Sequence, residues 1–180
     1  MNGSSPSILL IAYGNPGRQD DGLGPELAER LAKLQLANIE IDSDYQLTVE
    51  HALDISRVDV VIFVDATKED IEPYYFRPLT FDESATDLGF STHSISPQAV
   101  LKLSDELFAS KAKAYILGIR GYEFLQIEEG LSALAISNLN QAEMFIKTLL
   151  QSGDISLLEL AACQSDDSGC MDANLDNQHA

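Results

Sequence analysis

Three acids and a histidine that follow predicted strands are the residues best suited to chemistry. Asp20 and Asp21 lie in the glycine-rich segment YGNPGRQDDGLGP, directly after the apolar run ILLIA. Asp65 ends the apolar segment VDVVIFVDAT, and His93 lies in a loop before a predicted helix. Two adjacent carboxylates repel each other, and we expect that folding does not need them in this loop. Two carboxylates and an imidazole instead suit a site for a divalent cation such as Zn, Ni, Co, Mn or Fe.

Each of these residues also has a structural interpretation. Asp20 or Asp21 could cap the helix that follows the loop. Asp65 could accept hydrogen bonds from backbone N–H groups at the end of its strand. His93 could be a surface residue with no ligand. The glycines favour a ligand site, because they allow the backbone of a large partner to approach a bound metal closely.

Arg120 and Glu123, in the segment GIRGYEF, are two further candidates. Arg120 could hold the carboxylate of a substrate or of the acid cluster, or it could form an ion pair that balances local negative charge. Glu123 could add another acid to the same region. The glycines do not form G-x-G-x-x-G and no G-K-[ST] is present, so the sequence predicts neither a dinucleotide site nor a P-loop.

Apolar strands and amphipathic helices alternate along the chain, which predicts a three-layer α/β/α fold with a mostly parallel central sheet. The residue ranges predicted as strands are 7–14, 38–48, 58–67, 74–81 and 113–121. The ranges predicted as helices are 24–36, 49–58, 97–109 and 138–153. We expect the strand at 74–81 to be an antiparallel edge strand, and His51 to lie on a helix surface. In such a sheet ligands bind beyond the carboxyl ends of the strands, so these ends should bring the candidate residues together.

Composition limits the class of protein and its partners. The formal net charge is −18, so a nucleic acid backbone would be repelled. No apolar run reaches the length of a membrane span, and the first residues show no basic leader, so we expect a cytoplasmic protein. We expect one domain over residues 1–160, an acidic disordered tail over residues 161–180, and a monomer.

Four motifs together resemble the hydrogenase maturation endopeptidases, the processing proteases of nickel–iron hydrogenases. They are YGNPGRQDDGLGP, the strand end FVDA, STHSISPQAVL, and GIRGYEF followed by EEGLS. The loop pattern G-N-x-x-x-x-D-[DE]-G is the most specific of them. The segments YQLTVEHALDI and YYFRPLTF are similar to the branch that serves NAD-reducing, bidirectional hydrogenases.

The resemblance implies a three-layer α/β fold and an endopeptidase. Its expected substrate is the nickel-loaded precursor of a hydrogenase large subunit, from which it removes a C-terminal extension. By motif position, the resemblance places metal ligands at Asp21, Asp65 and His93. The metal is expected at the substrate site, as nickel carried by the precursor, and Zn or Cd could take its place in crystals.

Family members are grouped with aspartic-type endopeptidases, which implies catalytic roles for Asp21 and Asp65. We expect Asp20, as a spare carboxylate, to act as the base. The residues expected to contact the precursor are Gly14, Asn15, Arg120 and Glu123.

The chemical mechanism is left open by the sequence, which has no HExxH helix, no D-[TS]-G signature and no cysteine in a predicted core element. Two alternatives therefore remain. One is a receiver-like phosphoacceptor domain, in which Asp65 would be phosphorylated. The other is a non-enzymatic nickel-binding chaperone that holds the hydrogenase large subunit without cutting it.

Overall fold

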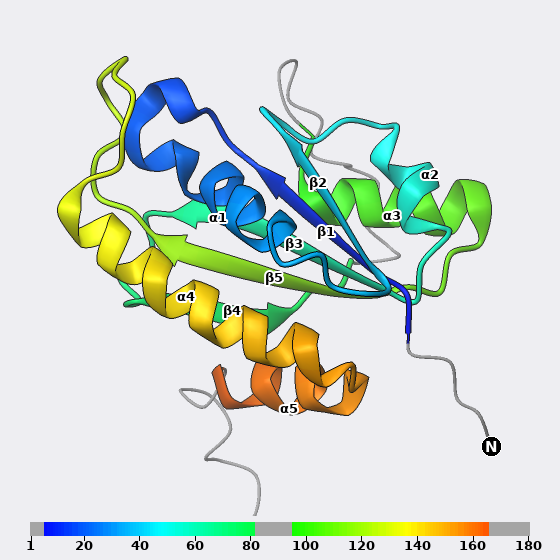
Figure 1. The fold of residues 1–180 in the computed structure, drawn as a ribbon. Coiled ribbons are helices and arrows are strands. Elements are labelled where there is room, and N and C mark those ends of the chain that lie inside the picture. Colours follow the sequence, from blue (N-terminus) through cyan, green and yellow to red (C-terminus); the bar gives the residue numbers. More distant parts are fainter. Residues whose placement is uncertain (1–5, 82–94, 166–180) are drawn as a thin grey trace, which may run out of the picture.

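The computed structural model describes residues 6–81 and 95–165, so His93 lies outside the described residues (Figure 1). The strands are β1 (Ile8–Tyr13), β2 (Ile39–Asp44), β3 (Val60–Thr67), β4 (Tyr74–Pro78) and β5 (Lys113–Arg120). The helices are the 3-10 helix η1 (Pro16–Gly22), α1 (Leu23–Ala32), α2 (His51–Ile55), α3 (Pro97–Phe108), α4 (Ala133–Ser152) and α5 (Ile155–Ser165). None of the helices in these ranges is long and apolar enough to cross a membrane.

One five-stranded sheet, in the order β2-β1-β3-β5-β4, forms the centre of the molecule. β1, β2, β3 and β5 run parallel, and β4 pairs antiparallel with β5 at the sheet edge. The predicted mostly parallel sheet with an antiparallel edge strand is therefore confirmed. β1 and β3 are apolar along nearly their whole length because helices cover both of their faces.

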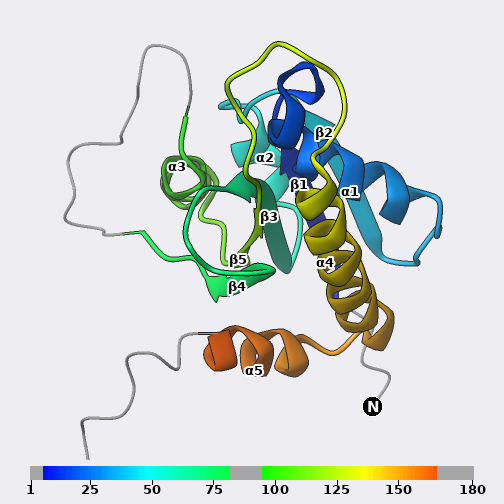
Figure 2. The same ribbon diagram turned by 90° about the vertical axis from the view of Figure 1, so that its left-hand side faces the viewer.

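Two hydrophobic clusters fill the space between the sheet and its helices. The first joins β1, β3, β4 and β5 to α1, α4 and α5, and the second joins the other face of the sheet to α2 and α3. Figure 2 shows these helix layers on opposite sides of the sheet. The fold is thus the three-layer arrangement that the alternating pattern predicts.

Helix α5 extends five residues into the segment that was predicted to be a tail. Leu158 and Ala162 lie one helical turn apart and are both buried in the first cluster. The sequence prediction missed this helix because it weighed the acidity of the segment more heavily than its short apolar spacing. The tail prediction for residues 166–180 lies outside the described residues.

His51 is buried, with 4% of its surface exposed, so its predicted place on a helix surface is wrong. Its Nδ1 accepts a hydrogen bond from the backbone N–H of Thr48, and its Nε2 lies 3.2 Å from Oδ2 of Asp42. Nε2 thus attaches α2 to β2 and Nδ1 holds the segment that leads into α2, which is a structural role.

Candidate active site

Four residues form a row across the carboxyl edge of the sheet. Asp65 of β3 pairs in register with Gly118 of β5, which in turn pairs with Tyr75 of β4. On the other side of β3, the last residues paired between β1 and β3 are Ala12 and Val64. The residues that follow them, Tyr13 and Asp65, are hydrogen-bonded through their side chains. The sheet therefore places a carboxylate between two tyrosines.

Gly118 allows this row to form. A Cβ at this position would lie 2.3 Å from Cζ of Tyr75 and 2.6 Å from its hydroxyl oxygen. The phenol ring thus occupies the space that a side chain on β5 would fill, and it lies close enough for Asp65 to affect the pKa of Tyr75. A close approach of this kind is a common reason for a glycine inside a strand.

The loop after β1 brings Asp21 to the same edge. Gly14 has φ of +140°, and a Cβ there would lie 2.0 Å from the backbone oxygen of Asp21, so only glycine fits. The N–H of Asn15 donates to Oδ2 of Asp21 at 2.9 Å, and Oδ1 of Asn15 accepts from Gly17 at the start of η1. Gly14 and Asn15 therefore orient Asp21, and their predicted contact with a precursor stays a prediction.

Asp21 and Asp65 line one open cavity of about 430 Å³. The other side chains around it include cations and aromatic rings. The full set is Arg18, Ala66, Thr67, Lys68, Tyr75 and Phe124. Two carboxylates that are 44 positions apart in the sequence thus face the same space, as the predicted sheet requires.

Burial and charge shift the proton affinity of Asp65. Its pKa is raised to about 7, above all because burial disfavours the ionised form, with the negative charge of Asp21 adding to the effect. The N–H of Ala66 and the hydroxyl of Tyr13 donate to Asp65 and oppose this rise. Burial and the neighbouring Asp65 also raise the pKa of Tyr13. Because the Asp65 carboxylate is poorly solvated, a cation beside it would strongly stabilise its ionised form.

The donor set suits a divalent cation that receives further ligands from elsewhere. In the described part of the chain, Oδ1 of Asp21 accepts no hydrogen bond, so it can coordinate. Residues 6–81 and 95–165 contain no group of three or more His, Cys, Asp or Glu side chains close enough to hold a metal ion. The described residues therefore supply two oxygen donors. The predicted third ligand, His93, stays a prediction because it lies outside the described residues.

Asp20 has a different environment from Asp21. It is fully buried, and its carboxylate accepts hydrogen bonds from the N–H groups of Tyr122, Glu123 and Ser132 and from the Ser132 hydroxyl, at 2.7–2.9 Å. Burial alone would raise its pKa, but these four bonds lower it. The geometry thus gives no support to the prediction that Asp20 is a spare base, because its oxygens are already used to hold the backbone.

The bonds of Asp20 attach the segment 121–132, called here the rim loop, to the loop after β1. The N–H of Asp20 donates to the Glu123 carbonyl, and the N–H of Gln19 donates to the Glu128 carbonyl. Gln19 has φ of 52° and ψ of −120°, an unfavourable backbone conformation for a residue with a side chain. Figures 1 and 2 both show η1 and the rim loop side by side beyond the carboxyl ends of the strands.

Arg120 and Glu123 also take part in the structure around the cavity. Arg120 donates to the backbone carbonyls of Lys68 and Glu69, and its guanidinium lies 3.9 Å from a carboxylate oxygen of Asp70. These contacts match the ion-pair interpretation and hold the segment after β3. Glu123 is exposed and accepts a hydrogen bond from the Gln19 amide. The predicted contacts of both residues with a precursor stay predictions.

Sequence reasoning missed the aromatic part of the site. Tyr13, Tyr75 and Phe124 were all inside predicted motifs, but a single sequence gives no sign that an aromatic side chain turns toward a carboxylate. For Tyr13 a signal was present, since it is the last residue of β1 and so shares the edge with Asp65. For Tyr75 the signal was Gly118, whose missing side chain implied a close neighbour.

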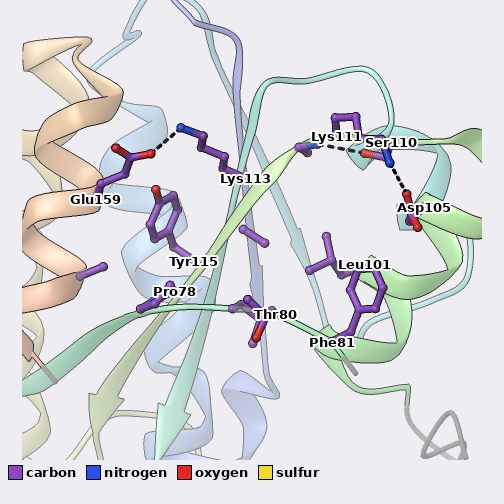
Figure 3. A pocket seen from close by; sticks show the side chains of 14 residues that line it. Pro78, Thr80, Phe81, Leu101, Asp105, Ser110, Lys111, Lys113, Tyr115 and Glu159 are labelled. Atoms are coloured by element: carbon purple, nitrogen blue, oxygen red, sulfur yellow. Dashed lines mark hydrogen bonds and ion pairs between the residues drawn. The ribbon is translucent and has the colours of Figure 1, made fainter. Parts of the chain in front are cut away.

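A larger cavity of about 760 Å³ lies at the opposite edge of the sheet, between α3 and α5 (Figure 3). Its two acids are each paired with a lysine: Asp105 with Lys111 at 2.9 Å, and Glu159 with Lys113. Its charges are thus balanced, and it offers no pair of carboxylates for a cation. The smaller cavity, which is lined by Asp21 and Asp65, is therefore the better candidate for the active site.

The fold and the site define an α/β protein with two carboxylates in one cavity at the carboxyl edge of its sheet, and comparisons with known proteins identify its relatives. A protein of Methanocaldococcus jannaschii, provisionally named a hydrogenase maturation protease, is 28% identical over 132 residues, covering 69% of this chain and 84% of that protein. No family model matches the chain.

Solved structures share the fold. The [NiFe] hydrogenase maturation protease HycI of Thermococcus kodakarensis superposes with a TM-score of 0.63 and 22% identity, covering 82% of this chain and 95% of that one. The hydrogenase maturating endopeptidase HybD of E. coli gives 0.60 and 20%, covering 81% and 92%. The resemblance to hydrogenase maturation proteases predicted from the motifs is therefore confirmed, while its NAD-reducing branch stays a prediction.

Proposed function

We propose that this chain is an endopeptidase that removes the C-terminal extension from the precursor of a nickel–iron hydrogenase large subunit in the cytoplasm. The observation that carries the proposal is the shared cavity of Asp21 and Asp65, at the edge of a fold common to hydrogenase maturation proteases. The relative from M. jannaschii supports the same activity by sequence.

We further propose that nickel carried by the precursor is what the site recognises. Asp21 and Asp65 supply oxygen ligands, and His93 is the third ligand in this proposal. Nickel beside Asp65 would favour its ionised form and so relieve the unfavourable burial of this carboxylate. A precursor without nickel would leave two carboxylates facing each other without a cation, and it would bind weakly.

The cleavage step is a hydrolysis in this proposal. Water attacks the carbonyl carbon of the scissile bond and loses a proton, the C–N bond breaks, and the leaving nitrogen takes up a proton. In this proposal one of the cavity carboxylates, Asp21 or Asp65, accepts that proton, whereas the oxygens of Asp20 already accept hydrogen bonds from the backbone and from Ser132. This assignment replaces the base predicted from the sequence.

The receiver-like alternative has less support. Receiver domains of the flavodoxin-like type use the parallel strand order 2-1-3-4-5. Here the outer position beyond β5 is taken by an antiparallel strand, β4. In addition, Arg120, which stands where a receiver has a lysine, is bonded to backbone carbonyls.

The test is to incubate the purified protein with large-subunit precursor that carries nickel or lacks it, and to measure the mass of the precursor. We expect only the nickel-loaded form to lose the mass of its extension, with Asp65→Asn protein as the inactive control. Equal cutting of both forms would contradict nickel recognition. Binding of the loaded form without cutting would favour the chaperone alternative.

A further inference from the structure

The tip of the rim loop exposes two large apolar side chains beside the cavity. Leu125 and Ile127 are each 91% exposed, more than any other large hydrophobic residue among those the structure describes. The residue before them, Phe124, lines the cavity together with Asp21 and Asp65. The exposed pair is therefore continuous along the chain with the candidate active site.

The backbone on both sides of this tip is fixed. Asp20 holds the N–H groups of Tyr122 and Glu123, and the N–H of Gln19 holds the carbonyl of Glu128. Lys68 lies over the ring of Phe124, with Nζ 4.7 Å from the ring centroid. The tip is thus held in place before any partner arrives, so binding to it requires little further ordering.

The rim loop itself is negatively charged, and the cations near it, Arg18 and Lys68, lie on its cavity side. Glu123, Glu128 and Glu129 are exposed within the rim loop, and the whole chain carries a formal charge of −18. Apolar residues surrounded by acids form the usual arrangement of a binding surface with an apolar centre and a polar margin. Such a margin attracts a partner whose matching surface is basic.

We propose that Leu125 and Ile127 are the docking residues for the protein substrate, which meets them with an apolar patch flanked by Lys or Arg side chains. This inference rests on the proposed function, because its occupant is the hydrogenase precursor. Docking at the rim loop places the precursor's cleavage segment next to Phe124 and then into the cavity with Asp21 and Asp65. The residues act by positioning the substrate and do not touch the reacting atoms.

The experiment compares the double variant Leu125→Ser/Ile127→Ser with a control variant, Leu107→Ser/Met144→Ser. The control removes two side chains that are 65% and 69% exposed on α3 and α4, away from the cavity. Affinity for nickel-loaded precursor is compared among the parent, tip and control proteins in one Asp65→Asn background, which prevents cutting and removes the same proposed nickel ligand from all three. The constants kcat and KM are measured in the active background. Thermal unfolding of each variant checks that the fold is kept.

We expect the tip variant to weaken binding and raise KM by about ten- to a hundredfold, because two aliphatic side chains lose their burial in the complex. Its kcat should stay within about twofold, since the interaction is made equally before and during the reaction. The control should match the wild type. Glu128→Lys/Glu129→Lys should slow association most at low salt.

Unchanged affinity and KM in the tip variant would overturn the inference while leaving the proposed function intact. A fall in kcat without a change in KM would also overturn it, because it would point to a role in organising the cavity. If the unmodified protein binds the precursor but does not cut it, the proposed protease function fails and the affinity comparison still decides the docking site. If it neither binds nor cuts, both fail.

Discussion

Asp20 and Asp21 are neighbours in the chain, yet their environments are opposite. Asp20 is buried among N–H donors that lower the pKa of its carboxyl group. Asp21 faces an open cavity and a second carboxylate, Asp65, whose pKa is raised by burial. The first environment stabilises a negative charge with the protein's own backbone, and the second leaves negative charge for a ligand to stabilise. The difference shows that one residue of a D-D pair holds the backbone around the cavity while the other faces the cavity itself.

The largest effect should come from neutralising the cavity carboxylates. Asp21→Asn or Asp65→Asn should each lower the rate of precursor processing by about a thousandfold or more, because each removes a charged ligand from the reaction site. Mass spectrometry of the large subunit measures the rate, and circular dichroism checks the fold. Activity retained by either folded variant would remove that residue from the active site.

Removing the other acid should affect stability most. Asp20→Ala leaves three backbone N–H groups and one hydroxyl without their acceptor, so we expect the free energy of unfolding to fall by about 3–5 kcal/mol. Urea unfolding measures this loss, and hydrogen exchange should show faster exchange at the N–H groups of Tyr122, Glu123 and Ser132. A loss below about 1 kcal/mol would mean that the rim loop is held in another way.

The pH dependence of stability should separate the two environments. Folded Asp65 keeps its proton up to about pH 7, whereas in the unfolded chain it loses it near pH 4. The unfolded state thus binds fewer protons in this window, and the wild type loses stability as pH rises from about 4 to 7. Asp65→Asn removes this penalty, so it should stabilise the protein by about 2–4 kcal/mol at pH 8 and by much less at pH 4.5.

The control for this prediction is Asp20→Asn. The pKa of Asp20 is lowered, so its stabilising effect is fully present above the unfolded value near 4 and is lost only as pH falls through the folded value. The difference between wild type and Asp20→Asn should therefore stay constant from pH 5 to 8. Denaturant unfolding without divalent ions measures both series. A constant difference for Asp65→Asn as well would contradict the buried setting of Asp65.

The smallest effect on processing should come from changing Arg120, which holds the segment after β3 beside the cavity. Arg120→Lys keeps the charge but cannot reproduce the forked contacts with the carbonyls of Lys68 and Glu69, so we expect a loss of about 1–2 kcal/mol in stability. Processing at low temperature should change less than about threefold. A large rise in KM for precursor would instead show that Arg120 binds the substrate.

The layers of the fold were predictable because they depend on patterns that a sequence displays directly. The continuous apolar run of β3 and the helical spacing of α1 define a covered parallel sheet, and Gly153, with φ of 62°, ends α4 where predicted. The part of the site that could be predicted is the part carried by strand ends, because Asp65 lies near the end of β3 and Asp21 follows the end of β1. Asp65 and Asp21 meet because parallel strands share one edge.

Other features depend on contacts between distant segments that no local pattern records. The role of Asp20 is determined by Ser132, 112 residues later, and the burial of His51 by its neighbour Asp42 on β2. The sequence does not distinguish Asp20 from Asp21, because their side chains enter different environments only when the chain is folded. Helix α5 is a different case, because the apolar spacing of Leu158 and Ala162 was visible in the sequence but was given less weight than the acidity of the segment.

The attachment of the rim loop has a consequence for protein engineering. Its anchors lie at residues 122, 123, 124, 128 and 132, outside the three-residue stretch 125–127. If the docking proposal is right, exchanging this stretch for the corresponding residues of a relative should change the precursor that is bound, while leaving the scaffold and the cavity acids Asp21 and Asp65 untouched. Cognate pairs of enzyme and precursor could therefore diverge by a few surface substitutions, without redesign of the chemistry.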